Sequence, residues 1–171
     1  PVILVVFLIS SYELNSQNIS NEQVKRHLYT LADDNMEGRK AGTEGAEKAA
    51  QYIENEFKRI GLTTFNDSET YRQNFEHKGL DLFNVIGYLP GKSKKDELVI
   101  ISAHYDHLGI ESGVEGDSIF NGANDNASGV AAVLALAEYF KEKNNNERSI
   151  LFVAFTAEEL GLVGSNYFGT T

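Results

Sequence analysis

Two continuous apolar runs constrain the fold of this 171-residue chain more than any other feature. The first, ELVIISA, covers residues 97–103, and the second, RSILFVAFTA, covers residues 148–157. Each has the length of a strand and is bounded by turn-forming residues, a pattern typical of a strand buried on both faces. Between them lies ASGVAAVLALAEYFK, residues 127–141, whose apolar positions recur at helical spacing. Strand, helix and strand in this order predict a right-handed βαβ unit.

The first half of the chain adds further elements of the same kind. SNEQVKRHLYTLA, residues 20–32, predicts a helix that opens with a capping box formed by Ser20 and Gln23. A second helix is expected over residues 43–61, because threonine begins the segment and glycine ends it. NVIGYLPG, residues 84–91, reads as a strand that stops at a Pro-Gly pair. The sequence therefore predicts an α/β fold with a mixed, largely parallel central sheet and helices on both faces.

The composition argues against some classes of binding partner and excludes some kinds of metal site. The net charge of -10 argues against non-specific binding of nucleic acid, which needs a basic surface. With 42% hydrophobic and 23% charged residues, the chain has the composition of an ordinary folded protein, and its length fits one domain. It contains no cysteine, so a zinc site could use only histidine, aspartate and glutamate. We expect no nucleic-acid partner, and the sequence indicates no oligomeric state.

The first residues predict an exported protein. An apolar run from Val2 to Ile9 turns polar at Ser10. The run is too short to span a bilayer and has the length of the apolar region of a signal peptide, although no basic segment precedes it. A buried strand is the alternative, since valine and isoleucine dominate the run. We expect residues 1–19 to be the remnant of a secretion signal with a linker, residues 20–171 to form the folded domain, and the protein to be secreted or periplasmic with no stable membrane span.

Three polar clusters follow or precede the predicted βαβ elements. HYDH (residues 104–107) follows the first buried strand, NGANDNASG (residues 121–129) begins the helix, and AEELG (residues 157–161) follows the second strand. In open α/β sheets, ligands bind outside the carboxyl ends of the strands. We therefore expect the three clusters to meet at one edge of the sheet.

The first cluster predicts one metal ligand and a supporting carboxylate. In an extended segment, residues two apart point to the same side, so His104 and Asp106 share a side and His107 faces the other way. This geometry suits a metal-binding imidazole whose second nitrogen is held by a carboxylate. The alternative for His104 is a hydrogen-bonded structural histidine. Tyr105 and His107 are interpreted as residues of the core or the rim.

The other two clusters offer carboxylates with two interpretations each. Asp125 could cap the helix, but Asn124 and Asn126 could do so equally well, and a carboxylate can also bridge two cations. Glu158 and Glu159 could simply enrich a helix N-terminus in acid. Adjacent residues of an extended chain face opposite ways, so the pair could instead divide its work. One carboxylate would bind metal while the other reaches the metal-bound water.

The motifs taken together resemble a known family. SAHYDHLG, then NGANDNASGVAAVLALAEYF, then RSILFVAFTAEELGLVGS is similar in motif and spacing to the M28 family of zinc aminopeptidases. The upstream segment LADDNMEGRKAGTEGAEKAAQYIENEFKRIGL also resembles the family's lead-in to its catalytic domain. The resemblance extends from about Asn21 to the end of the chain, and a combination of three motifs is specific.

The resemblance implies a reaction and a role for each site residue. It implies hydrolysis of peptide bonds at the N-terminus of peptides by a site that holds two zinc ions, with free-N-terminus peptides as substrates. His104 would bind one zinc, Glu159 the other, and Asp125 would bridge the two. Asp106 would orient His104, and Glu158 would be the general base. The family also tends to have a cis peptide after the bridging aspartate, here between Asp125 and Asn126.

The resemblance also implies ligands that this sequence does not contain. Family members carry a second aspartate and a second histidine after the AEELG motif, but the twelve residues that follow Glu159 include neither. His27 and His77 lie upstream, in a predicted helix and a polar loop, and fit the role poorly. A catalytic zinc takes three protein ligands. We therefore expect residues 20–171 to be the N-terminal part of a peptidase domain, incomplete at the C-terminus, which by itself binds metal poorly and catalyses little.

Other functions on the same scaffold stay open. A glutaminyl cyclase shares the fold by family resemblance and keeps similar ligands, but it transfers an aminoacyl group at one zinc. A non-catalytic binding module, as in receptor ectodomains that resemble these peptidases, would have lost its ligands. Here every ligand position that falls within the chain is filled. A nucleotide-binding α/β protein is disfavoured, because no G-x-G-x-x-G or Walker loop follows a strand.

Overall fold

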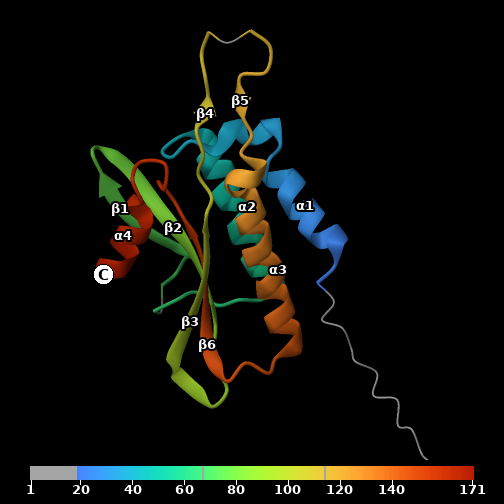
Figure 1. Cartoon of the computed structure of the whole chain (residues 1–171). Helices are drawn as coiled ribbons and strands as arrows, with labels where there is room; N and C mark the ends of the chain where they lie inside the picture. Colours follow the sequence, from blue (N-terminus) through green and yellow to red (C-terminus); the bar gives the residue numbers. More distant parts are fainter. Residues whose placement is uncertain (1–18, 67, 114) are drawn as a thin grey trace, which may run out of the picture.

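The computed structural model describes residues 19–66, 68–113 and 115–171. A four-stranded sheet in the order β1–β2–β6–β3 forms its centre (Figure 1). The strands are β1 (Arg72–His77), β2 (Leu80–Leu89), β3 (Lys94–His104) and β6 (Arg148–Phe155). β3 and β6 pair in parallel, whereas β2 pairs antiparallel with both β1 and β6. The predicted mixed α/β class is confirmed, but the described sheet is mostly antiparallel and not largely parallel, because β2 runs antiparallel to both of its neighbours, β1 and β6.

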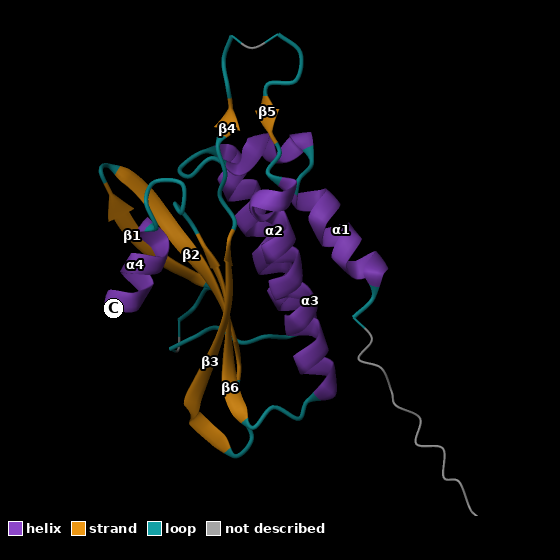
Figure 2. Cartoon of the chain, in the orientation of Figure 1, coloured by secondary structure: helices purple, strands orange, loops and turns teal. Residues whose placement is uncertain are grey.

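Helices cover both faces of the sheet, as the sequence predicted. On one face lie α1 (Asn21–Leu31), α2 (Glu44–Ile60) and α3 (Ser128–Lys143), and on the other lies α4 (Val163–Thr170) (Figure 2). The order β3, α3, β6 with parallel strands is the predicted βαβ unit. The predicted helix ends are also found, since Ser20 accepts a hydrogen bond from the Gln23 amide and Gly61 ends α2 in the left-handed region with φ of 82°.

β6 is buried on both faces, as its sequence predicted. Ile150, Phe152 and Ala154 face the main core, where they pack with α2 and α3. Leu151 and Val153 point to the opposite face and pack with residues that include Phe168 of α4. An uninterrupted apolar sequence is needed here because both sides of the strand lie against other elements.

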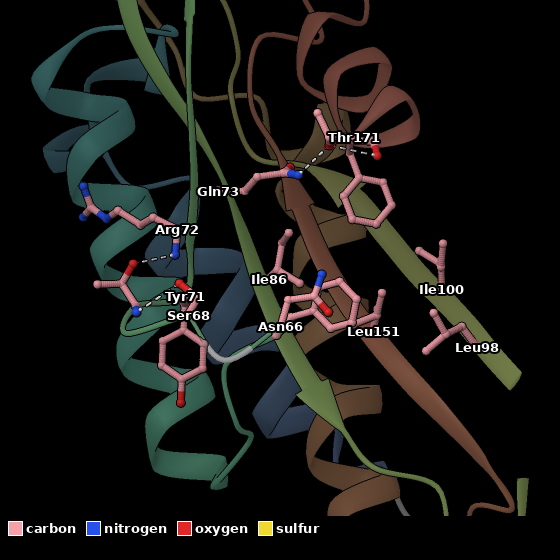
Figure 3. Close-up of a pocket in the computed structure, with 13 residues that line it drawn as sticks. Asn66, Ser68, Tyr71, Arg72, Gln73, Ile86, Leu98, Ile100, Leu151 and Thr171 are labelled. Atoms are coloured by element: carbon pink, nitrogen blue, oxygen red, sulfur yellow. Dashed lines mark hydrogen bonds between the residues drawn. The ribbon is translucent and has the colours of Figure 1, made fainter. Parts of the chain in front are cut away.

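β3 does not have the two-sided burial that its apolar run predicted. Leu98, Val99 and Ile100 remain 48%, 41% and 49% exposed. The reason is topological: β3 is an edge strand of the described sheet, so only β6 pairs with it. Leu98 and Ile100 line a cleft of about 560 Å³ on the face of the sheet that also carries Leu151 of β6 (Figure 3).

A small hairpin and two short helical turns stand at the edge where β3 and β6 end. The hairpin consists of β4 (Gly109–Ile110) and β5 (Ile119–Phe120) and projects beyond the sheet (Figure 1). The turns are η1 (Asp34–Arg39) and η2 (Ala123–Ala127). η1 contacts both strands of the hairpin. These irregular elements, and not the sheet itself, surround the polar clusters.

The predicted secretion signal lies outside the described residues, since its apolar run falls within residues 1–18. Within the part of the chain that the structure describes, no helix combines the length and apolar character that a membrane span requires. Secretion or a periplasmic location therefore stays a prediction.

Candidate metal centre

The three polar clusters meet at one edge of the sheet, as their positions in the sequence predicted. β3 ends at His104, β6 ends at Phe155, and η2 carries Asp125. His104 Nε2 lies 3.0 Å from Asp125 Oδ1. Single ligand atoms of His107, Asp125 and Glu159 lie within 4.8 Å of one another. All three clusters therefore contribute side chains to one group.

His104 is held at the end of β3 with its ring partly buried. Its Nδ1 lies 3.1 Å from the backbone oxygen of Asp106 and 3.7 Å from the carboxylate Oδ1 of the same residue. Burial lowers the pKa of His104, but Asp106 and the charge of Glu158 more than offset this, so the pKa is raised overall. With Nδ1 engaged by Asp106, Nε2 is the nitrogen that faces Asp125.

Asp106 has a second task that the sequence did not indicate. Its carboxylate is fully buried and accepts hydrogen bonds from the backbone amides of Glu158 at 3.0 Å and Glu159 at 3.3 Å. The expected support of His104 therefore comes mainly from the backbone carbonyl of Asp106, while its carboxylate holds the segment after β6. Asp106 thus joins the end of β3 to the end of β6.

His107 is part of the group, contrary to our interpretation of it as a core or rim residue. Its Nδ1 lies 2.7 Å from Glu159 Oε1. The error came from extending strand alternation too far. β3 ends at His104, so the two-residue period no longer applies at His107. Beyond the strand, His107 forms an isolated parallel β-bridge with Lys40, so its position depends on the segment that contains Lys40.

Asp125 does not cap α3. The cap-like contact is made by its neighbour, since Asn126 Oδ1 accepts a hydrogen bond from the Gly129 amide at 3.0 Å. The Asp125 side chain is 62% exposed and contacts His104. The peptide bond between Asp125 and Asn126 is cis, as the family resemblance implied. The carboxylate of Asp125 is thus free to face the other polar clusters.

Glu158 and Glu159 point to different partners. Glu158 Oε2 lies 3.9 Å from His104 Nε2, whereas Glu159 Oε1 contacts His107. The two residues lie in a turn beyond β6, and the preceding Ala157 has φ of 55°. The separation that we expected from strand alternation is therefore present, although a turn produces it.

Arg39 is a buried cation next to this group, and our sequence reasoning missed it. Its guanidinium is fully buried and donates to the backbone oxygens of Tyr105 and Gly122. Burial lowers its pKa to about 10, although the carboxylates of Asp106 and Asp125 act in the opposite direction. The arginine therefore remains charged at neutral pH. The available signal was an arginine between glycine-rich residues, MEGRKAG, in the segment that resembles the family's lead-in.

The donor set fits a zinc ion. Imidazole nitrogens and carboxylate oxygens are the ligands left to zinc in a chain without cysteine. Two ligands of a tetrahedral zinc with bonds of roughly 2.0–2.1 Å lie about 3.3 Å apart. The separation of 3.0 Å between His104 and Asp125 is close to that value. The pairing of His107 with Glu159 at 2.7 Å provides a second set of donors near the same aspartate.

Comparisons with known proteins agree with the motifs. Aminopeptidase YwaD of Bacillus subtilis strain 168 is 37% identical over 86 residues, which cover 50% of this chain and 17% of that protein. The crystal structure of LapB from Legionella pneumophila matches with a TM-score of 0.67 and 26% identity, over 89% of this chain and 39% of LapB. Glutaminyl cyclase of Porphyromonas gingivalis matches with a TM-score of 0.69 and 20% identity, over 87% of this chain and 54% of the cyclase, which shows the fold alone.

The chain covers little more than half of the length of the glutaminyl cyclase and about a sixth of the length of aminopeptidase YwaD. The sequence profile described as peptidase family M28 matches residues 84–171, slightly more than half of the chain. The matched residues contain His104, Asp125 and the Glu158–Glu159 pair. The chain belongs to peptidase family M28.

Proposed function

We propose that the protein is a zinc-dependent aminopeptidase that hydrolyses the first peptide bond of peptides with a free N-terminus. The observation that carries this proposal is the position of one carboxylate close to two sets of donors. Asp125 lies 3.0 Å from His104, and its ligand atom lies within 4.8 Å of those of His107 and Glu159. A carboxylate in such a position can bridge two metal ions, as in two-metal hydrolases.

Within this proposal, His104 would hold one zinc, Glu159 would hold the other, and Asp125 would be shared by both. Glu158 is the general base. Its carboxylate oxygen Oε2 lies 3.9 Å from His104 Nε2. Glu158 is not one of the three residues whose ligand atoms lie within 4.8 Å of one another. Its side chain is 37% exposed, so water and a substrate can reach it. An exposed carboxylate close to the proposed ligand His104 supports a role in proton transfer to and from water.

Bound zinc would lower the pKa of a coordinated water from about 15.7 to roughly 7 and polarise the substrate carbonyl. Glu158 accepts a proton from the attacking water and delivers it to the leaving amine nitrogen as the C–N bond breaks. Asp106 fixes the backbone of Glu158, since its carboxylate accepts that residue's amide hydrogen bond at 3.0 Å. The base is therefore anchored from the strand that carries His104.

The ligand set within the described residues is smaller than a complete site requires. His104, Asp125 and Glu159 give each of two zinc ions two ligands, whereas a catalytic zinc takes about three. The family resemblance implies one further aspartate and one further histidine as ligands. His107 is a further donor beside Glu159, and its contribution is open to a direct test below.

Two adjacent carboxylates provide a matched experiment. Glu158→Ala should keep its zinc content and lose turnover by about 10²–10⁴-fold, because the residue acts on water and not on the metal. Glu159→Ala and His104→Ala should lose zinc itself. Zinc is measured by elemental analysis and turnover with a dipeptide amide, with its N-acetylated form as the control substrate. Loss of zinc in Glu158→Ala, or full retention of both metals in Glu159→Ala, contradicts the assigned roles.

The glutaminyl cyclase alternative is separated by product and by metal content. A peptide with N-terminal glutamine yields free glutamine in the proposed reaction and a cyclised N-terminus in the alternative. The proposed site holds two zinc ions per protein, and the cyclase needs one. Mass spectrometry of the product decides between the two, and cyclisation without release of glutamine would overturn the aminopeptidase proposal.

A further inference from the structure

Arg39 is the largest fully buried side chain of the described residues, and its hydrogen bonds run to unusual acceptors. Nε donates to Tyr105 O at 2.8 Å, Nη1 to Asn121 O at 2.6 Å and Nη2 to Gly122 O at 3.0 Å, and Nη1 also donates to Leu31 O. Each of these acceptors is a backbone carbonyl. A buried cation is normally paired with a carboxylate, so this arrangement calls for a reason beyond charge neutralisation.

Three of the four carbonyls that Arg39 binds belong to the two segments next to His104 and Asp125, and the fourth is at the end of α1. Tyr105 follows His104 directly, and Asn121 and Gly122 precede η2, which contains Asp125. The planar guanidinium offers five donors in a fixed fork, so one side chain can hold both loops at a set separation. The separation it sets is the one between the His104 imidazole and the Asp125 carboxylate, 3.0 Å apart.

The backbone around Arg39 reinforces the same connection. The Arg39 carbonyl accepts a hydrogen bond from the His107 amide at 3.1 Å. Arg39 itself has φ of 52°, in the left-handed region that costs energy for any residue but glycine. A strained backbone persists where surrounding contacts over-determine it, and such positions cluster at functional sites.

Two glycines leave the space that this arrangement needs. A Cβ at Gly122 would lie 2.7 Å from Arg39 Nη2 and 2.5 Å from His107 Cδ2. A Cβ at Gly38 would lie 2.7 Å from Phe120 O and would collide with Gly109 O, at the base of the β4–β5 hairpin. Both glycines also have positive φ. The turn with Gly38 and Arg39 is thus fitted tightly against the loops of the metal centre.

We propose that Arg39 is a positioning residue of the metal centre, which holds the His104–His107 loop and the Asn121–Asp125 loop at the separation that zinc binding requires. The role rests on the proposed zinc site, and it adds to that site a residue that touches neither metal nor substrate. Lysine cannot replace the guanidinium, because a single ammonium group cannot reach both loops in the fork geometry.

Arg39→Lys tests the role, with Arg72→Lys as the matched control. Arg72 is partly buried, with 22% of its side chain exposed, and it donates to the carboxylates of Glu47 and Glu54 instead of to either loop. Zinc affinity is measured on the intact protein by competition with a chromophoric chelator. Loss of a residue that orients metal ligands typically weakens metal binding by about 10- to 100-fold. We expect such a loss for Arg39→Lys, with turnover restored at saturating zinc, and wild-type affinity for Arg72→Lys.

An affinity of Arg39→Lys within about threefold of wild type overturns the positioning role. If the wild-type protein itself binds no zinc, the proposed function fails and this role fails with it, so the two failures are told apart by the wild-type measurement. Should Arg39→Lys not fold, hydrogen–deuterium exchange of the wild type replaces it. Zinc should then protect residues 38–40 together with 104–107 and 121–125, and protection of the two loops without residues 38–40 contradicts the proposal.

Discussion

β6 and β3 are parallel neighbours with similar apolar sequences, yet one is buried on both faces and the other is not. In β6, Phe152 and Val153 are completely buried on opposite sides of the sheet. In β3, Leu98 and Ile100 stay about half exposed, because no described strand pairs with its outer edge and a cleft lies over one face. An apolar run therefore shows that a strand can be buried, and its neighbours decide whether it is.

The two strands become alike again where they end. Each runs into an irregular segment that carries polar side chains of the proposed metal centre, and the two segments are joined by Asp106. The different burial of β3 and β6 therefore affects the stability of the protein, whereas the edge of the sheet at which both strands end carries the proposed metal centre. Substitutions along the strands should affect unfolding, and substitutions beyond them should affect metal binding.

Phe152→Ala in β6 should have the largest effect on stability. The side chain is fully buried, so its truncation leaves a cavity and should lower the free energy of unfolding by about 3–5 kcal/mol. Urea denaturation of the intact protein, followed by circular dichroism, measures the change. A cost below about 1 kcal/mol would mean that β6 is not the centre of the core.

Asp106→Asn should have the next largest effect. The amide nitrogen of asparagine cannot accept a hydrogen bond, so one of the backbone amides of Glu158 and Glu159 would lose its partner in a buried place. The free energy of unfolding should fall by about 2 kcal/mol. Asp96→Asn, in the exposed part of β3, is the control and should change little. Equal stability of the two variants would show that Asp106 does not join the strand ends.

His107→Ala should weaken zinc binding by about tenfold, equivalent to about 1.4 kcal/mol, while the protein stays folded. The reason is the contact between His107 Nδ1 and Glu159 Oε1, which orients a proposed ligand. His77→Ala is the matched control, since His77 is also partly buried but lies in β1 and is not among the clustered donors. Chelator competition measures both affinities. Unchanged zinc affinity in His107→Ala would return this residue to a structural role.

Ile100→Ala in β3 should have the smallest effect, about 1 kcal/mol in the free energy of unfolding, because the side chain is 49% exposed. Ile150→Ala in β6 provides the comparison, since that isoleucine is only 4% exposed and should cost about 2–5 kcal/mol. Urea denaturation measures both variants. Equal costs at the two positions would show that the open face of β3 is covered in the intact protein, and the contrast between the strands would disappear.

Several features were predictable from the sequence because they depend on local pattern. The helical spacing of α2 and α3, the βαβ order and the capping contact at Ser20 each involve residues close together in the chain. The three polar clusters were also predictable as one group, since the carboxyl ends of neighbouring parallel strands meet at one edge of a sheet. The proposed roles of His104, Asp125 and Glu159 come from the family resemblance and stay a prediction.

Other features were decided only by the tertiary structure, because they join residues far apart in sequence. The side of His107 depends on where β3 ends, and the acceptors of the Arg39 guanidinium come from segments up to 83 residues away. The exposure of β3 depends on which strand lies beside it. The backbone amides that donate to the Asp106 carboxylate lie in a turn after β6. The sequence by itself determined the helices α1, α2 and α3 and the strands β2, β3 and β6, and it supplied candidate metal ligands, although not His107. Buried hydrogen bonds between loops that are distant in the sequence hold those segments against one another. The local periodicity of the sequence cannot predict such hydrogen bonds.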